Sequence, residues 1–519
     1  MRSMIVTFAI ALSGCTTSVT GNGLPDGGNN NGSDGGNNFN FDFAGMQVCS
    51  PSDPPTCDGT SVKTCRFDGS GYDYQFCASG CNNGSCTCMQ GDVMCQGQDV
   101  VTCGMDGMYH VTQTCANGTQ CINGSCTDAR CSDETMGTNP HALPTNAWPR
   151  YRHDNRNSGS TPTKVAAMPK LKWKVHVGGS NINSNGGLGS GPVVNQNNVL
   201  FQTGGDKEPM NAGLHSYDAT GKQLWFFPAG TAFASSTPAV RTDGTSYFSI
   251  QVGGMLYAID PMGKQQWQFP TGSQADSDPV VTKDGNVIYS SDDGSAYGLT
   301  ANGMQLWKSD PNTGPGEVDG GIAESCDGKI YLGGRNGWFQ LDPLTGKTIW
   351  SVPTTGSTNT ILSSPYVTAD GTMYGFDSGG MGYAIDAKGN VLWKKQIGPN
   401  GFQFFGGSAT GKIGNTIFSI LNDGSLHAVD AGNGNNLWTA PVGGAAREIN
   451  SGPISDGNNT LYVNGNDGFV YAFDINGKQV WKLPTSGVAA SMDVAGTPAI
   501  GNDGTLYVPG NDGNLYAFQ

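Results

Sequence analysis

The sequence predicts an all-β protein: an eight-bladed β-propeller, closed by an amino-terminal strand and preceded by two small disulfide-rich modules. A tryptophan recurs at intervals of 40 to 52 residues, close to the length of one four-stranded blade. Asp-Gly or a related pair separates short β-rich runs, as in antiparallel hairpins. A six-cysteine pattern occurs twice before these repeats. The recurring tryptophans are Trp173, Trp225, Trp267, Trp307, Trp350, Trp393, Trp438 and Trp481.

The amino terminus predicts secretion and a lipid anchor. Residues 1–14 have the short apolar run of a signal peptide, too short to span a bilayer. The stretch Leu12 to Cys15 resembles the lipobox of bacterial lipoproteins, which implies a lipid on Cys15 and anchoring in the membrane. Thr16 after that cysteine implies, by the same resemblance, the outer membrane, facing either the periplasm or the cell surface. The alternative is an ordinary secretory signal with a chance cysteine.

Residues 15–48 follow as the lipidated cysteine and a flexible Gly/Asn linker with almost nothing to bury. The two cysteine-rich repeats are then expected at 49–87 and 88–131. Each is too short and too polar to fold by burial alone, so three disulfides per repeat are the physical solution, in an unspecified pairing. No Cys-x-x-Cys pair favours zinc. We expect the repeats either to space the main domain from the membrane or to bind a glycan or protein.

A linker and lead segment are expected at 132–165 and the propeller at 166–519. Seven of the tryptophans have a glycine four residues earlier, where a tight turn needs positive φ, whereas Trp173 has Pro169 there. The last repeat ends after three strands. The segment from Leu171 to Val177 should therefore supply the fourth strand, pairing near Tyr516 and closing the ring.

The stretch "LDPLTGKTIW" (Leu341 to Trp350) resembles the tryptophan-docking motif of quinoprotein-like propellers, as do "YDATGKQLW" and "FDINGKQVW". In that family the ring of each Trp stacks between neighbouring blades. "WPRYRHDNRNSG" (Trp148 to Gly159) resembles the segment that often precedes such propellers. The resemblance is specific for the fold but not for an activity.

Two functions follow from this resemblance. Some members are quinone-dependent dehydrogenases that hold calcium and a quinone beside adjacent cysteines, a feature this propeller lacks because Cys326 is its one cysteine. Other members are outer-membrane assembly lipoproteins with eight such blades and no cofactor. We therefore expect a monomeric, noncatalytic scaffold that binds a protein or glycan, without cofactor or metal. The alternative is a quinone-dependent dehydrogenase or another extracellular enzyme. The net charge of −15 argues against nucleic acid as a partner.

If a ligand binds, the loops between second and third strands and those between blades should form its face. The candidate residues on that face are Asp276, Asp278, Glu317, Asp319, Arg335, Arg447, Glu448 and Asp493. Their alternative interpretation is an ordinary solvated rim. On the opposite face we expect Cys326 to pair with Cys131, because these are the two thiols left after the modules and the lipid; the alternative is a small buried Cys326. A basic cluster at Arg150 to Arg156 should lie against that acidic underside, with partner binding as its rival.

Overall fold

The computed structural model describes residues 49–519 except 59–60, 67–69, 77–80, 83–84, 87–92, 97–98, 104–108, 115–118, 123–124, 129–146, 179–187, 189, 206–211, 231–235, 252, 272, 275–276, 311–312, 317, 319, 355–362, 378, 400–410, 422, 444–450 and 487–495. The signal peptide, Cys15 and the linker lie outside these residues. The chain divides into two compact units, 1–88 and 89–519. All regular elements in the described part are strands.

The first cysteine-rich repeat contains a three-stranded sheet of β1 (Thr56–Asp58), β2 (Ser61–Cys65) and β3 (Tyr72–Phe76), and a two-stranded hairpin of β4 (Cys81–Asn82) and β5 (Ser85–Cys86). The second repeats this plan with β6 (Val93–Gln96), β7 (Asp99–Cys103) and β8 (Tyr109–Thr114), followed by β9 (Thr119–Ile122) and β10 (Ser125–Asp128). The cysteine pattern therefore marks a repeated structural unit.

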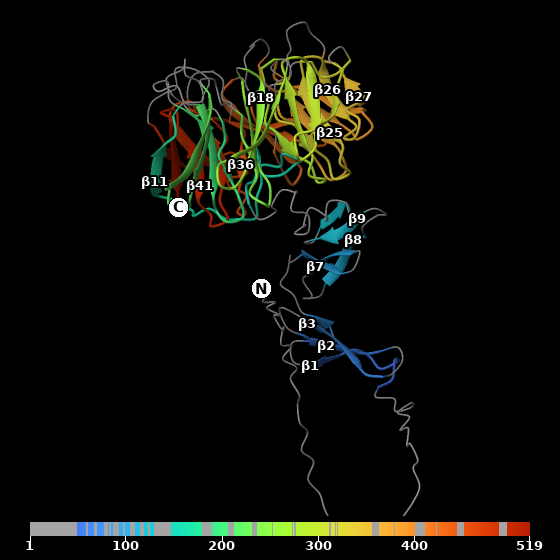
Figure 1. Ribbon diagram of the computed structural model, residues 1–519. Coiled ribbons are helices and arrows are strands. Elements are labelled where there is room, and N and C mark those ends of the chain that lie inside the picture. The colour runs from blue at the N-terminus through green and yellow to red at the C-terminus, as the bar shows by residue number, and fades with distance from the viewer. Residues whose placement is uncertain are drawn as a thin grey trace, which may run out of the picture. The chain divides into compact units, whose positions relative to one another are not determined.

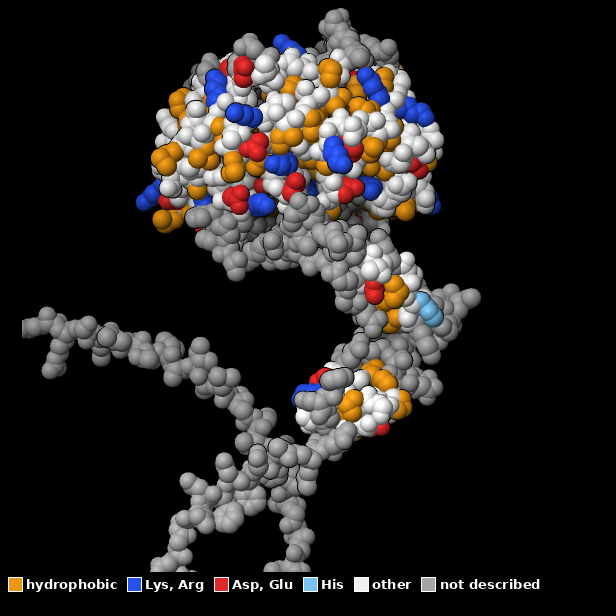
Figure 2. All heavy atoms as spheres, turned by 90° about the vertical axis from the view of Figure 1, so that its right-hand side faces the viewer, with side chains coloured by type: hydrophobic (Ala, Val, Ile, Leu, Met, Phe, Trp, Pro, Cys, Tyr) orange, Lys and Arg blue, Asp and Glu red, His pale blue; other side chains and the backbone are white. Residues whose placement is uncertain are grey.

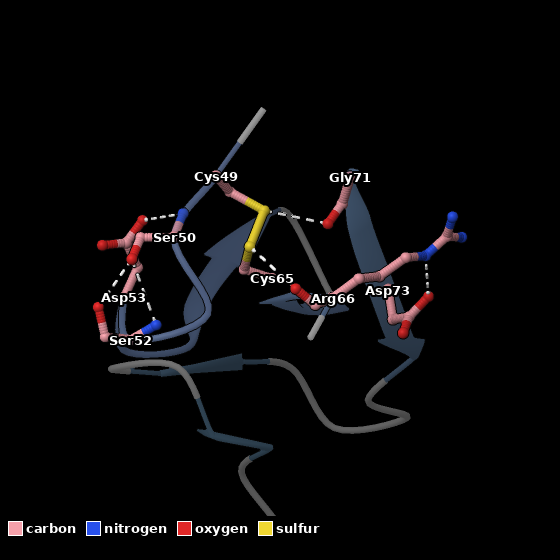
Figure 3. Close-up of a disulfide and its surroundings, with 8 residues drawn as sticks. All are labelled: Cys49, Ser50, Ser52, Asp53, Cys65, Arg66, Gly71 and Asp73. Atoms are coloured by element: carbon pink, nitrogen blue, oxygen red, sulfur yellow. Dashed lines mark hydrogen bonds and ion pairs between the residues drawn. A yellow bond between two sulfur atoms is a disulfide. The ribbon is translucent and has the colours of Figure 1, made fainter. Parts of the chain in front are cut away.

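One disulfide resolves part of the pairing that the sequence left open. Cys49 and Cys65, the first and third cysteines of the first repeat, are joined with their Cα atoms 5.8 Å apart. Figure 3 shows this bridge at the end of β2, beside the ion pair in which Arg66 Nε lies 2.8 Å from an Asp73 oxygen. Cys57 and Cys103 are also disulfide-bonded.

Eight four-stranded antiparallel sheets form the propeller (Figure 1). We number them blades 1 to 8 in chain order. The first strands are β12 (Val193–Val194), β16 (Ala239–Val240), β20 (Val280–Val281), β24 (Ala323–Glu324), β28 (Tyr366–Val367), β32 (Gly411–Ile413), β36 (Ile454–Ser455) and β40 (Ala499–Ile500). First strands of several neighbouring blades contact one another, β12 and β40 of the first and last blades among them, so these short strands lie nearest the axis.

The other strands follow outward in order. The second strands are β13 (Leu200–Gly204), β17 (Ser246–Ile250), β21 (Val287–Ser291), β25 (Ile330–Gly334), β29 (Met373–Phe376), β33 (Thr416–Ile420), β37 (Leu461–Asn464) and β41 (Leu506–Pro509). The third are β14 (Ala212–Tyr217), β18 (Met255–Ile259), β22 (Ser295–Leu299), β26 (Gly337–Leu341), β30 (Met381–Ile385), β34 (Ser425–Asp430), β38 (Phe469–Phe473) and β42 (Asn514–Phe518). The outer strands are β15 (Gln223–Gly230), β19 (Gln265–Pro270), β23 (Gln305–Lys308), β27 (Thr348–Val352), β31 (Val391–Gln396), β35 (Asn436–Pro441), β39 (Gln479–Pro484) and β11 (Leu171–His176).

The closure of the ring is confirmed. Strand β11 pairs antiparallel with β42, and Lys174 lies opposite Tyr516. Figure 1 shows β11 in teal next to the red carboxyl-terminal strands. Blade 8 is thus built from both ends of the domain, which removes a free edge that would otherwise remain at the last blade.

The hydrophobic core lies between blades rather than in one centre. One cluster, for example, joins Phe201 and Leu214 of blade 1 to Phe248 and Ile259 of blade 2. Second and third strands are buried on both faces because a neighbouring blade covers each side. Every blade therefore depends on its neighbours for burial, and the ring closes this chain of contacts.

The residues 148–164, which we call the lead segment, run past the blades in order. Trp148 forms a two-way backbone bridge with Val194 of blade 1, and the Pro149 carbonyl accepts from the Val240 amide of blade 2 at 2.7 Å. Asn155 reaches blades 3 and 4, Arg156 blade 5 and Gly159 blade 7 through hydrogen bonds to first-strand residues. Gly411 of blade 6 and Gly504 of blade 8 have no room for a Cβ beside this segment. The lead segment therefore touches all eight blades.

Candidate functional site

The docking of the tryptophans between blades is the most regular feature of the propeller. A Cβ on the turn glycine of the following blade would lie only 2.3 to 2.8 Å from the indole. Gly263, for example, has φ of 81° and faces the ring of Trp225. The glycine is thus required twice, by its backbone angle and by the indole above it. The pairs are Trp173–Gly221, Trp225–Gly263, Trp267–Gly303, Trp307–Gly346, Trp350–Gly389, Trp393–Gly434 and Trp438–Gly477.

Each of these seven indoles also donates a hydrogen bond to the same turn. The Nε1 atoms lie 2.7 to 3.2 Å from a carbonyl two or three residues before the glycine. Among the residues that the structure describes, Trp481 is the one docking tryptophan without such a bond. It faces the closing blade, where Pro169 stands in place of the glycine. At this interface Trp481 is buried in a hydrophobic cluster that also contains Tyr516 and Phe518 of blade 8.

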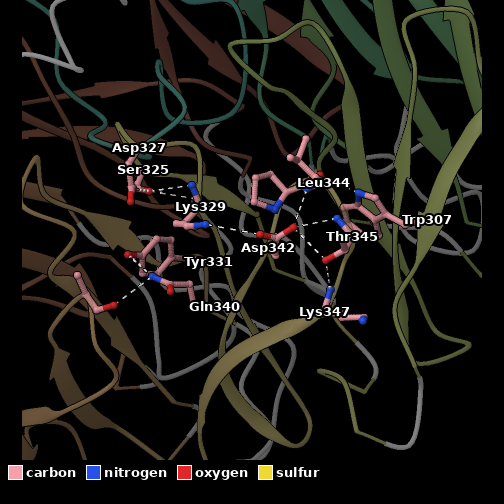
Figure 4. Close-up of polar contacts among 12 residues, drawn as sticks. Trp307, Ser325, Asp327, Lys329, Tyr331, Gln340, Asp342, Leu344, Thr345 and Lys347 are labelled. Carbon is pink, nitrogen blue, oxygen red and sulfur yellow. Dashed lines mark hydrogen bonds and ion pairs between the residues drawn. The ribbon is translucent and has the colours of Figure 1, made fainter.

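An aspartate organises the turn that receives the indole. In blade 4, Asp342 Oδ1 accepts from the amides of Leu344 and Thr345 at 3.1 and 3.0 Å, and Lys329 Nζ lies 3.6 Å from Oδ2 (Figure 4). Burial would raise the pKa of Asp342, but the bonds from Thr345 and Leu344 and the charge of Lys329 outweigh burial and lower it. Trp307 donates to the Pro343 carbonyl of this turn at 2.8 Å.

A belt of hydrogen bonds joins four pairs of neighbouring blades near the axis. The amide before a first strand donates to a side chain at the same position in the next blade: Gly191 to Thr237, Thr237 to Asp278, Gly321 to Ser364 and Gly452 to Thr497, at 2.5 to 3.1 Å. Our sequence reasoning missed this belt. The signal was present as a repeated Ser-x-Pro before the first strands, as in Ser190 to Pro192 and Ser236 to Pro238.

Asp278 belongs to this belt, where its Oδ1 accepts from the Thr237 amide at 2.5 Å. Arg335 lies in the turn between β25 and β26. The other six candidate residues of the ligand face, Asp276, Glu317, Asp319, Arg447, Glu448 and Asp493, lie outside the described residues. A ligand face formed by these eight residues remains a prediction.

Within the described part of the chain, no group of three or more His, Cys, Asp or Glu side chains is placed to hold a metal ion. Cys326, in the turn between β24 and β25, is buried and disulfide-bonded. Its proposed partner Cys131 lies outside the described residues, so that pairing stays a prediction. In the described part of the chain, no helix has the length and apolar character needed to cross a membrane.

The arginines of the basic cluster contact main-chain carbonyls as well as acidic side chains. Arg150 and Arg152 are fully buried, and both donate to main-chain carbonyls of the first-strand region, from Ile322 and Pro453. Carboxylates do contribute, because Asp278, Asp154 and Glu324 all raise the pKa of Arg150 against the lowering effect of burial. Arg150 and Arg152 are therefore part of the interior of the ring, whereas His153 and Arg156 are partly exposed.

The outer wall of the ring carries a second repeated pattern. The residue before the docking tryptophan is apolar and exposed in six blades: Leu224, Leu306, Ile349, Leu392, Leu437 and Val480. On the side seen in Figure 2, hydrophobic side chains are interspersed with basic and acidic ones. Outer strands also contain lysines such as Lys308 and Lys394, which are typical of edges protected from pairing with another sheet.

The repeats that build the blades match a known protein family. The model of the family described as outer membrane protein assembly factor BamB matches residues 210–370 and 378–519, more than half of the chain. BamB from Burkholderia pseudomallei is 29% identical over 111 residues, which cover 21% of this chain and 26% of that protein. The aligned part thus spans about a quarter of that curated relative.

Two solved structures share the fold. BamB from Moraxella catarrhalis matches with a TM-score of 0.52 and 16% identity, over 68% of this chain and all of that one. The quinohemoprotein alcohol dehydrogenase from Comamonas testosteroni matches with a TM-score of 0.57 and 15% identity, over 75% of this chain and 83% of that one. At these identities the likeness concerns the fold, which both a BamB protein and an oxidoreductase adopt. With its docking tryptophans, its closed ring of eight blades and the match across most of those blades, the chain belongs to the family of the outer membrane protein assembly factor BamB.

Proposed function

We propose that this protein is a lipid-anchored scaffold of the cell envelope, whose propeller binds a protein partner in outer-membrane assembly and catalyses no reaction. Family membership is the observation that carries this proposal, because the matched residues include the repeats that build the blades. The partner is a protein on this view, and a glycan is the second possibility. The lipid on Cys15 and the 15–48 linker would hold the propeller near the outer membrane.

The interior of the ring supports binding rather than quinone chemistry. The quinone enzymes resembled by this fold carry adjacent cysteines at the cofactor, whereas Cys326, the one cysteine of this propeller, has no cysteine next to it. Buried side chains of the lead segment occupy the inside of the ring near the first strands. The donor set described there therefore does not fit the quinone and calcium site of those enzymes, and we derive no reaction through that group.

The anchor and the partner can be tested together. We expect full-length protein to fractionate with outer membranes and to be released by detergent, while a Cys15→Ser variant is recovered in the soluble fraction. Photo-crosslinkers on the outer wall and on the loops between blades should then trap a component of the outer-membrane assembly machinery. Purified Cys15→Ser protein, added back to the membranes, serves as the control that the variant is folded.

The enzymatic alternative is tested on the same preparation. Purified protein incubated with pyrroloquinoline quinone and calcium should neither retain the quinone after gel filtration nor reduce a dye with alcohols or sugars. Stoichiometric quinone with dye reduction would overturn the scaffold proposal. Crosslinks confined to proteins unconnected with outer-membrane assembly would overturn the proposed partner.

A further inference from the structure

The lead segment sends three fully buried polar side chains into the ring. Arg150 Nη2 donates to the Ile322 carbonyl at 2.9 Å, Arg152 Nη1 to the Pro453 carbonyl at 2.9 Å, and Asn157 Nδ2 to the Pro365 carbonyl at 2.9 Å. Ile322, Pro453 and Pro365 each stand immediately before a first strand, in blades 4, 7 and 5. One short segment thus supplies the partners for backbone carbonyls on different sides of the axis.

Tyr151, from the same segment, is also buried and neighbours residues of three blades. Burial raises the pKa of its hydroxyl, while the hydroxyls of Ser364 in blade 5 and Thr497 in blade 8 act in the opposite direction. The aromatic ring of Tyr151 also lies within contact distance of Gly321 in blade 4, where a Cβ would be 2.9 Å from Tyr151 Cδ1. A side chain that neighbours blades 4, 5 and 8 at once must lie near the axis.

The burial of two guanidinium groups shows how firmly this arrangement is fixed. Burial lowers the pKa of both Arg150 and Arg152 to about 10, which reflects the cost of removing each charge from water. That cost is offset by hydrogen bonds from their N–H groups to main-chain carbonyls before the first strands, and by nearby negative charges such as that of Asp154. The backbone of the lead segment meanwhile accepts from the amides of Val240, Val367 and Ser455. Removing the segment would leave donors and acceptors unpaired at the axial strands of several blades.

We propose that the lead segment is a permanent axial plug, which seals the mouth of the ring that it covers and links the eight blades. It is not a lid that a ligand displaces. Two features argue for permanence. Its contacts are distributed over all eight blades, and the side chains of Trp148, Arg150 and Arg152 are enclosed rather than laid on the surface. A ligand or partner then does not enter the ring through the mouth that the lead segment covers. This inference concerns the ring alone and does not rest on the proposed function.

A cut in the chain after the plug separates the two possibilities. Ala166, Ala167 and Met168 form an exposed stretch between the lead segment and β11, so a protease site can be inserted there. The full chain carries Cys131→Ser and Cys326→Ser, so that no disulfide between these positions can hold the pieces together. After cutting, a permanent plug should co-elute with the ring in gel filtration at micromolar concentration, and separate only in denaturant.

Two variants test whether the buried side chains hold the plug in the ring after the cut. Arg152→Ala with Asn157→Ala removes bonds from the buried side chains and should speed release of the amino-terminal piece at least about tenfold. Lys164→Ala, at an exposed side chain of the same segment, should leave the release rate unchanged. Spontaneous release from the unmutated plug, or equal rates for the two variants, would overturn the proposal.

Hydrogen exchange on the uncut natural protein gives a second measurement that needs no substitution. The amides of Val240, Glu324, Val367 and Ser455 donate to lead-segment carbonyls. A permanent plug protects them as strongly as amides inside the second strands. Exchange of these four within minutes, while the second strands remain protected, would identify a mobile lid.

Discussion

Each docking indole is held by two blades at once, which makes the tryptophans the residues on which the ring most depends. Trp307 is buried, donates to Pro343 of the next blade and covers Gly346 there. Its neighbour Leu306 points the other way on the same strand and is 47% exposed. Period-two alternation on an outer strand thus separates a residue that joins blades from one that faces solvent.

We predict that Trp307→Ala lowers the free energy of unfolding by about 3 kcal/mol or more, because it leaves a cavity between blades and an unpaired carbonyl. Leu306→Ala should change the free energy of unfolding by no more than about 0.5 kcal/mol, because its side chain is half exposed. Denaturant unfolding of both variants checks this. Equal effects would mean that the indole does not join blades 3 and 4.

The environment of Asp154 predicts that the lead segment loses stability at acidic pH. Burial would raise its pKa, but His153, Arg156 and Ser158 outweigh burial and hold the pKa below its usual range. The Ser158 hydroxyl donates to this carboxylate at 2.5 Å. A depressed pKa stabilises the folded state above the unfolded value, near pH 4, and this stabilisation is lost as pH falls through the folded pKa.

The natural protein should therefore exceed an Asp154→Asn variant in stability by a constant margin between about pH 5 and 8, and the margin should shrink below about pH 4. Urea unfolding at several pH values measures it. A margin that grew toward acid would contradict the stated environment of Asp154.

The cysteine-rich repeats show what a sequence pattern can and cannot predict about an element. The sequence predicts two equivalent modules from matched spacing, and the strands of the two do correspond. The pairing could not be predicted, because spacing alone does not bring particular sulfurs together. Once Cys49 is seen bonded to Cys65, the repeat itself extends the result.

By that equivalence, Cys88 should be bonded to Cys103, the first and third cysteines of the second repeat. Cys103 is disulfide-bonded, and β7 corresponds to β2, which ends at Cys65. Peptide mapping without reductant should recover the Cys88–Cys103 pair alongside Cys49–Cys65. Recovery of Cys103 with any other cysteine would show that the modules share strands but not connectivity.

The propeller elements were more predictable than the lead segment. Docking tryptophans and turn glycines could be read directly, since each repeats with the blade. The lead segment occurs once, so no period reveals its role. Its arginines were expected to lie against an acidic underside, whereas the structure buries Arg150 and Arg152 and pairs them with carbonyls that carry no side-chain signature.

At the scale of the whole molecule, two sets of contacts between neighbouring blades and one plug explain why a ring of mostly short strands is stable. Tryptophans join blades near the outer strands, and hydroxyl and carboxylate side chains join them near the axis. Both sets depend on closure, because an open ring would expose an interface on its first and last blades. Blade 8 is where closure occurs, through β11 and β42.

The most direct test of this account is to trap that closure covalently. Lys174 and Tyr516 lie directly opposite on β11 and β42. Such positions bring Cα atoms within reach of a disulfide. In a Lys174→Cys/Tyr516→Cys variant, peptide mapping without reductant should recover the 174–516 crosslink. A control variant places the second cysteine at Tyr471, on the corresponding strand β38 of blade 7, and should give no 174–471 crosslink. Recovery of 174–471 in place of 174–516 would contradict an eighth blade shared by the two ends of the domain.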